Sequence, residues 1–165
     1  MFDNSNIQQK IRVRKKGLSE FSNLNIDIVL EMYAGAGILS KFWSQIANKL
    51  ICVEKDKSKL DNIIYENVEK YNTDNNSLAI INISKDIQII DCDAYGKVTN
   101  QLKILLDIAT TDKLIFFTDG TLKQEMKTKQ KFFDEEMKKL NADKIYYEKA
   151  IGGNVYYGYI FKKLK

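Results

Sequence analysis

The 165-residue sequence contains no histidine and no proline, and only two cysteines. Without histidine, the chain lacks the commonest general base and the commonest zinc ligand. Its chemistry must then rest on carboxylates, hydroxyls, amides or the positioning of a substrate. Cys52 and Cys92 both lie in apolar, strand-like runs, which favours reduced, buried thiols over a disulfide or a metal site. We therefore expect no metal.

Long apolar runs are also absent. No stretch approaches the about 20 residues that span a bilayer, and the polar start MFDNSNIQQK lacks the apolar core of a secretory signal. We therefore expect a cytoplasmic protein with no membrane partner. The length fits one domain, and 44% hydrophobic with 29% charged residues is the balance of an ordinary globular protein.

Positive charge is modest in total, at +4, but it is unevenly distributed. Basic residues crowd the N-terminal segment and close the chain: Lys10, Arg12, Arg14, Lys15, Lys16, Lys162, Lys163 and Lys165. Such clusters attract polyanions, although a solvated tail or edge explains each of them equally well. We divide the chain into a basic segment at 1–26 and a single domain at 27–165.

Runs that suit strands alternate with runs that suit helices along this domain. We expect strands at 27–33, 49–54, 67–72, 87–92 and 113–117, and helices at 38–47, 57–65, 76–83, 99–110 and 122–140. Composition would also allow a strand at 77–83, but the three residues before the next strand are too few for a parallel crossover. Two alternating runs at 144–150 and 155–162, joined by Gly152-Gly153-Asn154, indicate a hairpin.

This order predicts an α/β fold with a mostly parallel, seven-stranded sheet, helices on both faces and a terminal antiparallel hairpin.

The run 29–40 carries the strongest functional signal of the sequence. It combines a buried strand, Glu31, a turn with glycines at 35 and 37, and a helix start where Ser40 can satisfy free N–H groups. A dinucleotide site would have a third glycine at position 40 and would need no acid before the turn, so the pattern points away from NAD.

The pattern Glu31-x-x-x-Gly35-x-Gly37 resembles motif I of the class I S-adenosylmethionine (SAM)-dependent methyltransferases, with Glu in place of the commoner Asp. The resemblance implies a Rossmann-like methyltransferase fold, which ends in the same antiparallel hairpin, and SAM as the cofactor. It places Glu31, Tyr33, Ala34, Gly35 and Gly37 at the cofactor, and the segment 1–26 as a cap over the cofactor site.

Further acids follow the later strands. Glu54 corresponds to the family's ribose-binding acid, although an ion pair with Lys55 or Lys57 is an alternative. Asp74 resembles the motif III acid that accepts a hydrogen bond from the adenine amino group, although it also suits a plain turn. Lys55 and Asp91 complete the predicted cofactor set.

The run Asp91-Cys92-Asp93-Ala94-Tyr95-Gly96 resembles motif IV in the Asp-x-Asp-Pro-Phe-Gly form of the tRNA guanine-N2 methyltransferases. Ala94 replaces the proline, which removes backbone stiffness, and Tyr95 replaces the phenylalanine. The resemblance implies that Asp93 holds an exocyclic amine while Tyr95 stacks on the base, so we predict both as catalytic. Helix capping or turn formation is the alternative for Asp91 and Asp93.

The leading hypothesis is a SAM-dependent N-methyltransferase that acts on a nucleobase, in RNA rather than DNA, with a tRNA-like substrate. Candidate substrate contacts are Arg12, Arg14, Lys15, Lys16 and Asp119, the last of which an Asp-Gly turn explains equally well. Two alternatives stay open. One is a SAM-binding subunit without activity of its own, which needs a partner chain or a second copy, and the other is a methyltransferase of DNA, protein or a small molecule.

Overall fold

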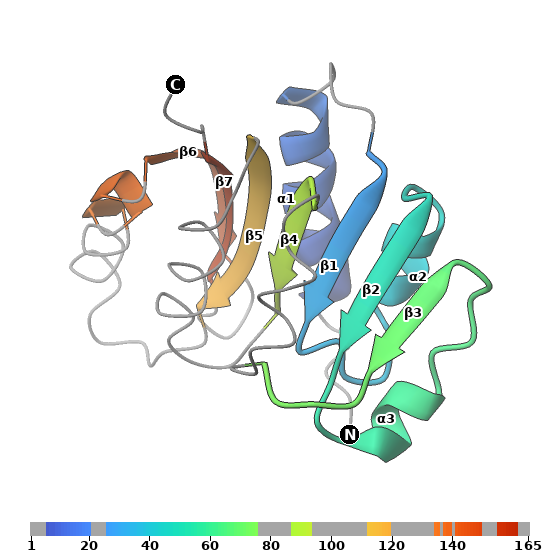
Figure 1. The fold of residues 1–165 in the computed structure, drawn as a ribbon. Coiled ribbons are helices and arrows are strands. Elements are labelled where there is room, and N and C mark those ends of the chain that lie inside the picture. Colours follow the sequence, from blue (N-terminus) through green and yellow to red (C-terminus); the bar gives the residue numbers. More distant parts are fainter. Residues whose placement is uncertain are drawn as a thin grey trace.

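The structure is a computed structural model that describes residues 6–20, 26–75, 87–93, 112–119, 134–135, 137–139, 141–149 and 155–161. Figure 1 shows its strands in one twisted sheet, with α1 and α2 behind it. The elements are α1 (Ile7–Glu20), β1 (Ile28–Met32), α2 (Ser40–Ser44), β2 (Lys49–Val53), α3 (Lys57–Asp61), β3 (Val68–Tyr71), β4 (Ile89–Cys92), β5 (Lys113–Asp119), β6 (Ala142–Lys149) and β7 (Val155–Phe161). Among these helices, none is long and apolar enough to span a bilayer.

The strands follow the order β3-β2-β1-β4-β5-β7-β6. The first five pair in parallel, while β7 pairs antiparallel with β5 on one side and with β6 on the other. The predicted parallel α/β sheet is therefore confirmed. Because β1 lies between β2 and β4, the chain reverses its direction of sheet growth there, which is where open α/β folds form their ligand sites.

The strands begin and end within two residues of their predicted positions, whereas the helices differ more. Helix α2 covers five residues instead of 38–47, and α3 covers five instead of 57–65. The carboxylate of Asp56 caps α3 by accepting the N–H of Ser58. The expected cap at Ser40 is wrong, because Leu39 holds the N-cap position of α2 without a side-chain bond and the Ser40 hydroxyl points elsewhere.

Other predicted helices lie largely beyond what the structure describes. The ranges 76–83 and 99–110 fall outside the described residues. Of the range 122–140, the described residues 134–135 and 137–139 are helical.

Helix α1 is the element that the sequence reasoning missed. The sequence analysis predicts the segment 1–26 as a basic segment that caps the cofactor site, with no helix in it, yet 7–20 form a helix that packs against β5, β6 and β7. Ile7, Ile11 and Leu18 recur at helical spacing and pack on the core. A charged residue, Arg14, occupies the middle of this buried face, and it breaks the apolar pattern by which an amphipathic helix is recognised.

The central strands β1, β2, β4 and β5 are buried on both faces. Trp43 of α2 and Gly17 of α1 both lie against Phe116, so the two helices cover the same face. A Cβ at Gly17 would lie 2.7 Å from the Phe116 ring, so a side chain there would push the helix off the sheet. Alternate residues on the second face are buried as well: Leu30, Met32, Ile51, Val53, Ile90, Cys92 and Ile115. This alternation also separates the free, buried thiols of Cys52 and Cys92, as predicted.

Candidate functional site

The register of the sheet sets polar side chains in a row beneath α1 and α2. Glu31 on β1 is level with Cys52 on β2 and with Asp91 on β4, and Asp91 is level with Phe116 on β5. Residues paired in this way project from the same face. Two carboxylates therefore lie side by side on a buried surface, where an uncompensated charge is costly.

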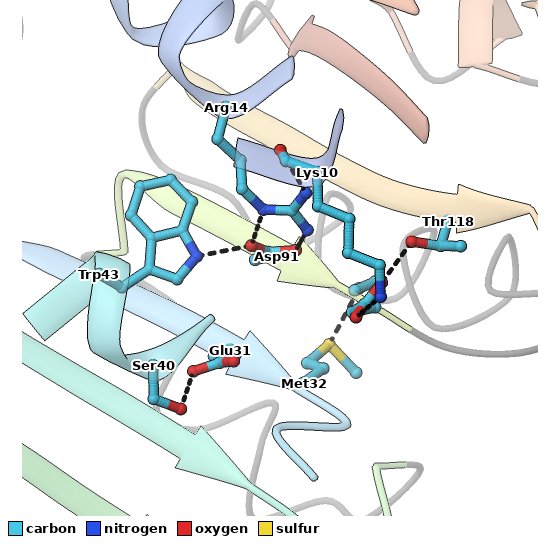
Figure 2. A network of polar contacts seen from close by, with 10 residues as sticks. Lys10, Arg14, Glu31, Met32, Ser40, Trp43, Asp91 and Thr118 are labelled. Atoms are coloured by element: carbon cyan, nitrogen blue, oxygen red, sulfur yellow. Dashed lines mark hydrogen bonds and ion pairs between the residues drawn. The ribbon is translucent and has the colours of Figure 1, made fainter. Parts of the chain in front are cut away.

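Arg14 compensates the charge of Asp91. Its guanidinium donates from Nε and Nη2 to the two carboxylate oxygens, at 2.6 and 2.5 Å. The indole Nε1 of Trp43 donates to the same carboxylate at 2.5 Å, and Figure 2 shows Asp91 between these two donors. Arg14 and Asp91 are 1% and 0% exposed. Burial alone would lower the pKa of Arg14, but the charge and hydrogen bond of Asp91, together with the charges of Asp93 and Glu31, outweigh it and raise the pKa, so the arginine stays charged.

This network corrects two predictions. Arg14 does not contact a nucleic acid, because its face of α1 is turned to the sheet and its donors bind Asp91 and the carbonyl of Lys10. Asp91 does not bind the cofactor, because it is fully buried beneath Arg14 and Trp43. Asp91 is thus structural, while Asp93, two residues further on, lies at the sheet edge.

Among the described residues, Glu31 has no cationic partner of this kind, and its carboxyl group avoids a buried charge by keeping its proton. It is almost fully buried, and it accepts hydrogen bonds from the Ser40 hydroxyl at 2.5 Å and from the Cys52 thiol at 3.5 Å. Burial, helped by the charge of Asp91, raises the pKa of Glu31 from 4.5 to about 8. At neutral pH, Glu31 is therefore mostly neutral.

The turn after β1 depends on glycine. Gly35 and Gly37 have φ values of 55° and 80°, in the left-handed region that glycine adopts without strain. A Cβ at Gly37 would in addition lie 2.7 Å from the side chain of Ile63. Tyr33 adopts φ 60°, and its N–H donates to the side-chain oxygen of Asn75 at 3.2 Å. The described chain thus bends back sharply at the carboxyl end of β1.

Glu54 ties this turn to the next one. Its two carboxylate oxygens accept the N–H groups of Gly35 at 3.0 Å and Asp56 at 2.9 Å. The predicted alternative, an ion pair with a neighbouring lysine, does not describe this geometry, since Lys57 pairs with Asp61. Glu54 therefore bridges the turns that follow β1 and β2.

Asp93 follows the end of β4 at the same edge. One oxygen accepts Lys10 Nζ at 2.5 Å and the other accepts the Thr118 hydroxyl. Burial alone would raise the pKa of Asp93, but the positive charges of Arg14 and Lys10, with these hydrogen bonds, lower it below its ordinary value. Asp93 is therefore ionised at neutral pH.

These groups meet in a cleft of about 380 Å³ at the carboxyl edge of the sheet. Its volume suits a small molecule, whose sites are commonly about 300–1,000 Å³. The cleft brings together seven of the predicted residues, namely Glu31, Tyr33, Ala34, Gly35, Glu54, Lys55 and Asp93. Helix α1 adds Ile7 and Lys10, neither of which was predicted as a site residue.

The remaining predicted residues that the structure describes do not line this cleft. Gly37 faces Ile63 and a neighbouring groove, and Asp74 is exposed after β3. Tyr95 falls outside the described residues, and Asp119 ends β5. The basic residues Arg12, Lys15 and Lys16 are exposed on α1. Within the described ranges, no group of three acidic, cysteine or histidine side chains is arranged to hold a metal ion.

Two asparagines support the cleft and were missed. Asn75 holds Tyr33, and the Asn72 amide donates to the carbonyls of Glu54 and Lys55 at 3.0 and 2.9 Å. The sequence signal that could have revealed them is the Asn-rich run after β3, because asparagine side chains often form hydrogen bonds with the backbone of turns. The sequence analysis interprets that run through Asp74 alone.

The sequence matches no protein family model and no curated protein. The structure, in contrast, resembles many solved structures. A Pyrococcus horikoshii protein to which a transferase activity has been ascribed aligns with TM-score 0.71 and 21% identity, over 99% of this chain and 66% of its own length. TYW2 from M. jannaschii, solved with AdoMet, aligns with TM-score 0.68 and 15% identity, over 99% and 78% of the two chains.

An rRNA methylase from Streptococcus thermophilus aligns with TM-score 0.67 and 12% identity, over 94% of this chain and 97% of its own. The fold is that of the SAM-dependent methyltransferases. At sequence identities of 12–21%, the similarity to these structures shows a shared fold and nothing more specific. The chain also spans just under two thirds of the length of the Pyrococcus protein.

Arg14→Met should destabilise the protein by about 3–5 kcal/mol, because it leaves the Asp91 charge buried without its partner. Lys15→Met, which removes one positive charge from the exposed side of the same helix, is the control and should change stability by about 0.5 kcal/mol or less. Both are measured by urea unfolding. An Arg14→Met variant as stable as Lys15→Met would contradict the buried ion pair.

Glu31→Gln should flatten the pH dependence of stability. The native state keeps the Glu31 proton up to about pH 8, whereas the unfolded state loses it near 4.5, so rising pH destabilises the wild type across that window. The unfolding free energy of the wild type, relative to Glu31→Gln, should fall on the order of a few kcal/mol between about pH 5 and 8. Urea unfolding at several pH values checks this, and parallel curves for the two proteins would refute it.

Proposed function

We propose that this chain is a SAM-dependent methyltransferase that methylates an exocyclic amine of a nucleobase in RNA, with a tRNA-like substrate. The proposal rests on the way the residues that line the 380 Å³ cleft are arranged. Glu54 and Asp93 follow strands on either side of β1, and the turn from Tyr33 to Gly35 lies between them. The AdoMet-bound TYW2 structure with the same fold supports the choice of cofactor.

The cleft residues fit the chemical groups of SAM. An ionised carboxylate offers about four acceptor positions, and Glu54 uses two of them for backbone N–H groups, so two remain for the ribose hydroxyls. Ile7, Ile38 and Leu39 give the cleft an apolar lining for the purine. When bound, SAM supplies a methyl group on a sulfonium, so transfer breaks a carbon–sulfur bond, forms a carbon–nitrogen bond and leaves a neutral thioether.

The task of Asp93 is to hold the acceptor amine. An ionised carboxylate only accepts hydrogen bonds, so Asp93 can hold an amine N–H and orient the nitrogen toward the methyl group. Because its pKa is lowered, Asp93 is a weak base, and the proton that the nitrogen loses passes to water. Tyr95 keeps its predicted role of stacking on the base. No step requires histidine, in agreement with the composition.

A basic groove beside the cleft supports a nucleic-acid substrate. It has a volume of about 770 Å³ and shares Ile7, Ala36 and Ile38 with the cleft. Lys15 of α1 and Lys41 of α2 line it, together with the aromatic rings of Phe42 and Tyr65. Lysines combined with aromatic rings suit the phosphates and bases of a single strand. The rRNA methylase among the structures of this fold is consistent with RNA.

Glu54→Gln should weaken SAM binding about tenfold or more, because the amide loses the charge and an acceptor position for the ribose hydroxyls. Glu69→Gln on β3, the same change outside the cleft lining, is the control and should bind like the wild type. Isothermal calorimetry measures both. Asp93→Asn should still bind SAM, at least as tightly as the wild type, but lose transfer of labelled methyl groups to RNA.

Several outcomes of these assays would go against the proposal. Absence of SAM binding by the wild type refutes the cofactor, and equal binding by Glu54→Gln refutes the site. SAM binding without transfer to any acceptor favours the non-catalytic subunit, and label in DNA, protein or a small molecule favours the other alternative.

Replacing both Lys15 and Lys41 by glutamine should raise the KM for RNA several-fold and leave SAM affinity unchanged. It should also reduce the slope of log affinity against log salt by about 2, about one unit for each lost phosphate contact. The control, Lys16→Gln with Lys49→Gln, makes the same change in net charge away from the groove. Filter binding at several salt concentrations compares the two, and equal loss in both would argue against the groove.

A further inference from the structure

In this structure, Lys10 forms an ion pair with Asp93, the carboxylate that the acceptor amine must reach. Its Nζ lies 2.5 Å from one oxygen of Asp93, and the Thr118 hydroxyl donates to the other. The side chains of Lys10 and Asp93 are only 15% and 18% exposed, so water screens the pair weakly. Figure 2 shows Lys10 extending from α1 to this end of β4. An amine entering here meets a carboxylate whose charge is already neutralised.

The other two acids that the structure describes in the cleft lining, Glu54 and Glu31, already accept hydrogen bonds from other groups. Glu54 accepts the N–H groups of Gly35 and Asp56, and Glu31 accepts the Ser40 hydroxyl and is mostly neutral at pH 7. Among the described residues that line the cleft, neither of these offers a second anion for Lys10. A ligand that brings an anion into the cleft therefore offers this ammonium a new partner.

The backbone of Lys10 is fixed while its side chain is long. Arg14 Nη1 donates to the Lys10 carbonyl at 2.9 Å, and Arg14 is itself held by Asp91. The four-carbon stem of lysine lets its ammonium change direction without movement of the helix. Lys10 can thus exchange anions at the cleft mouth while α1 stays on the sheet.

SAM carries a suitable anion, its α-carboxylate. Building on the proposed function, we propose that Lys10 holds Asp93 in the cofactor-free protein and transfers to the α-carboxylate of SAM, which frees Asp93 for the acceptor amine. Lys10 is then a positioning residue that couples the two ligands. Because Asp93 and the cofactor compete for one ammonium, SAM must bind before the acceptor amine is held well.

The test compares SAM with decarboxylated SAM, which lacks only the α-carboxylate. Calorimetry measures both ligands on the wild type, Lys10→Met, Lys10→Arg, Asp93→Asn and the Lys10→Met/Asp93→Asn double variant. Lys10→Met should weaken SAM about tenfold or more and decarboxylated SAM by less than about twofold, with Lys10→Arg restoring most of the loss. Asp93→Asn should tighten SAM several-fold, since Lys10 no longer leaves a carboxylate, and the double variant should lose this gain.

The outcomes separate this proposal from the proposed function. If Lys10→Met weakens both ligands equally, or if Asp93→Asn does not tighten SAM, the exchange is overturned while SAM binding stands. If the wild type binds neither ligand, both proposals fail together. Urea unfolding of each variant shows that a change in affinity is not a loss of folded protein.

Discussion

The buried ion pair between Arg14 and Asp91 is the interaction on which the rest of the site depends. The sheet register brings Asp91 beside Glu31, so two carboxylates share a surface from which water is excluded. One is neutralised by the guanidinium and the other keeps a proton, because burial raises its pKa to about 8. These two different solutions let β1 and β4 stay adjacent, which in turn brings the turn after β1 next to Asp93.

Helix α1 consequently belongs to the site as much as to the fold. The contact that fixes it to the sheet, Arg14 with Asp91, lies one helical turn from Lys10, which reaches Asp93. Phe116 also supports the packing of α1 on the sheet. The Arg14 guanidinium lies 5.6 Å from the centre of the Phe116 ring, and Gly17 lets the helix approach the same ring. A shift of the helix would therefore move a cleft residue and not only a packing residue.

Strand positions and strand-end acids could be predicted from the sequence because their signals are local. Apolar runs located β1, β2 and β4, and an acid near the end of each pointed to Glu31, Glu54 and Asp93. Helix α1 was missed because its buried face contains an arginine, which favours solvent unless a partner is known. That partner lies 77 residues away, and no local pattern joins the two. The support from Asn75 was hidden for the same reason, since it reaches Tyr33 across 42 residues.

The run Asp91-Cys92-Asp93 shows how depth separates two residues that the sequence analysis places at one ligand site, Asp91 at the cofactor and Asp93 at the acceptor amine. A strand alternates its side chains, so both acids project from the face beneath α1. Asp91 is level with Glu31 inside the sheet, where a charge needs a fixed buried partner, and Arg14 supplies it. Asp93 lies one pleat repeat further, where the sheet ends and a cleft opens, so its partner is a flexible lysine. The rigid partner keeps the first acid structural, and the flexible partner leaves the second available to a ligand.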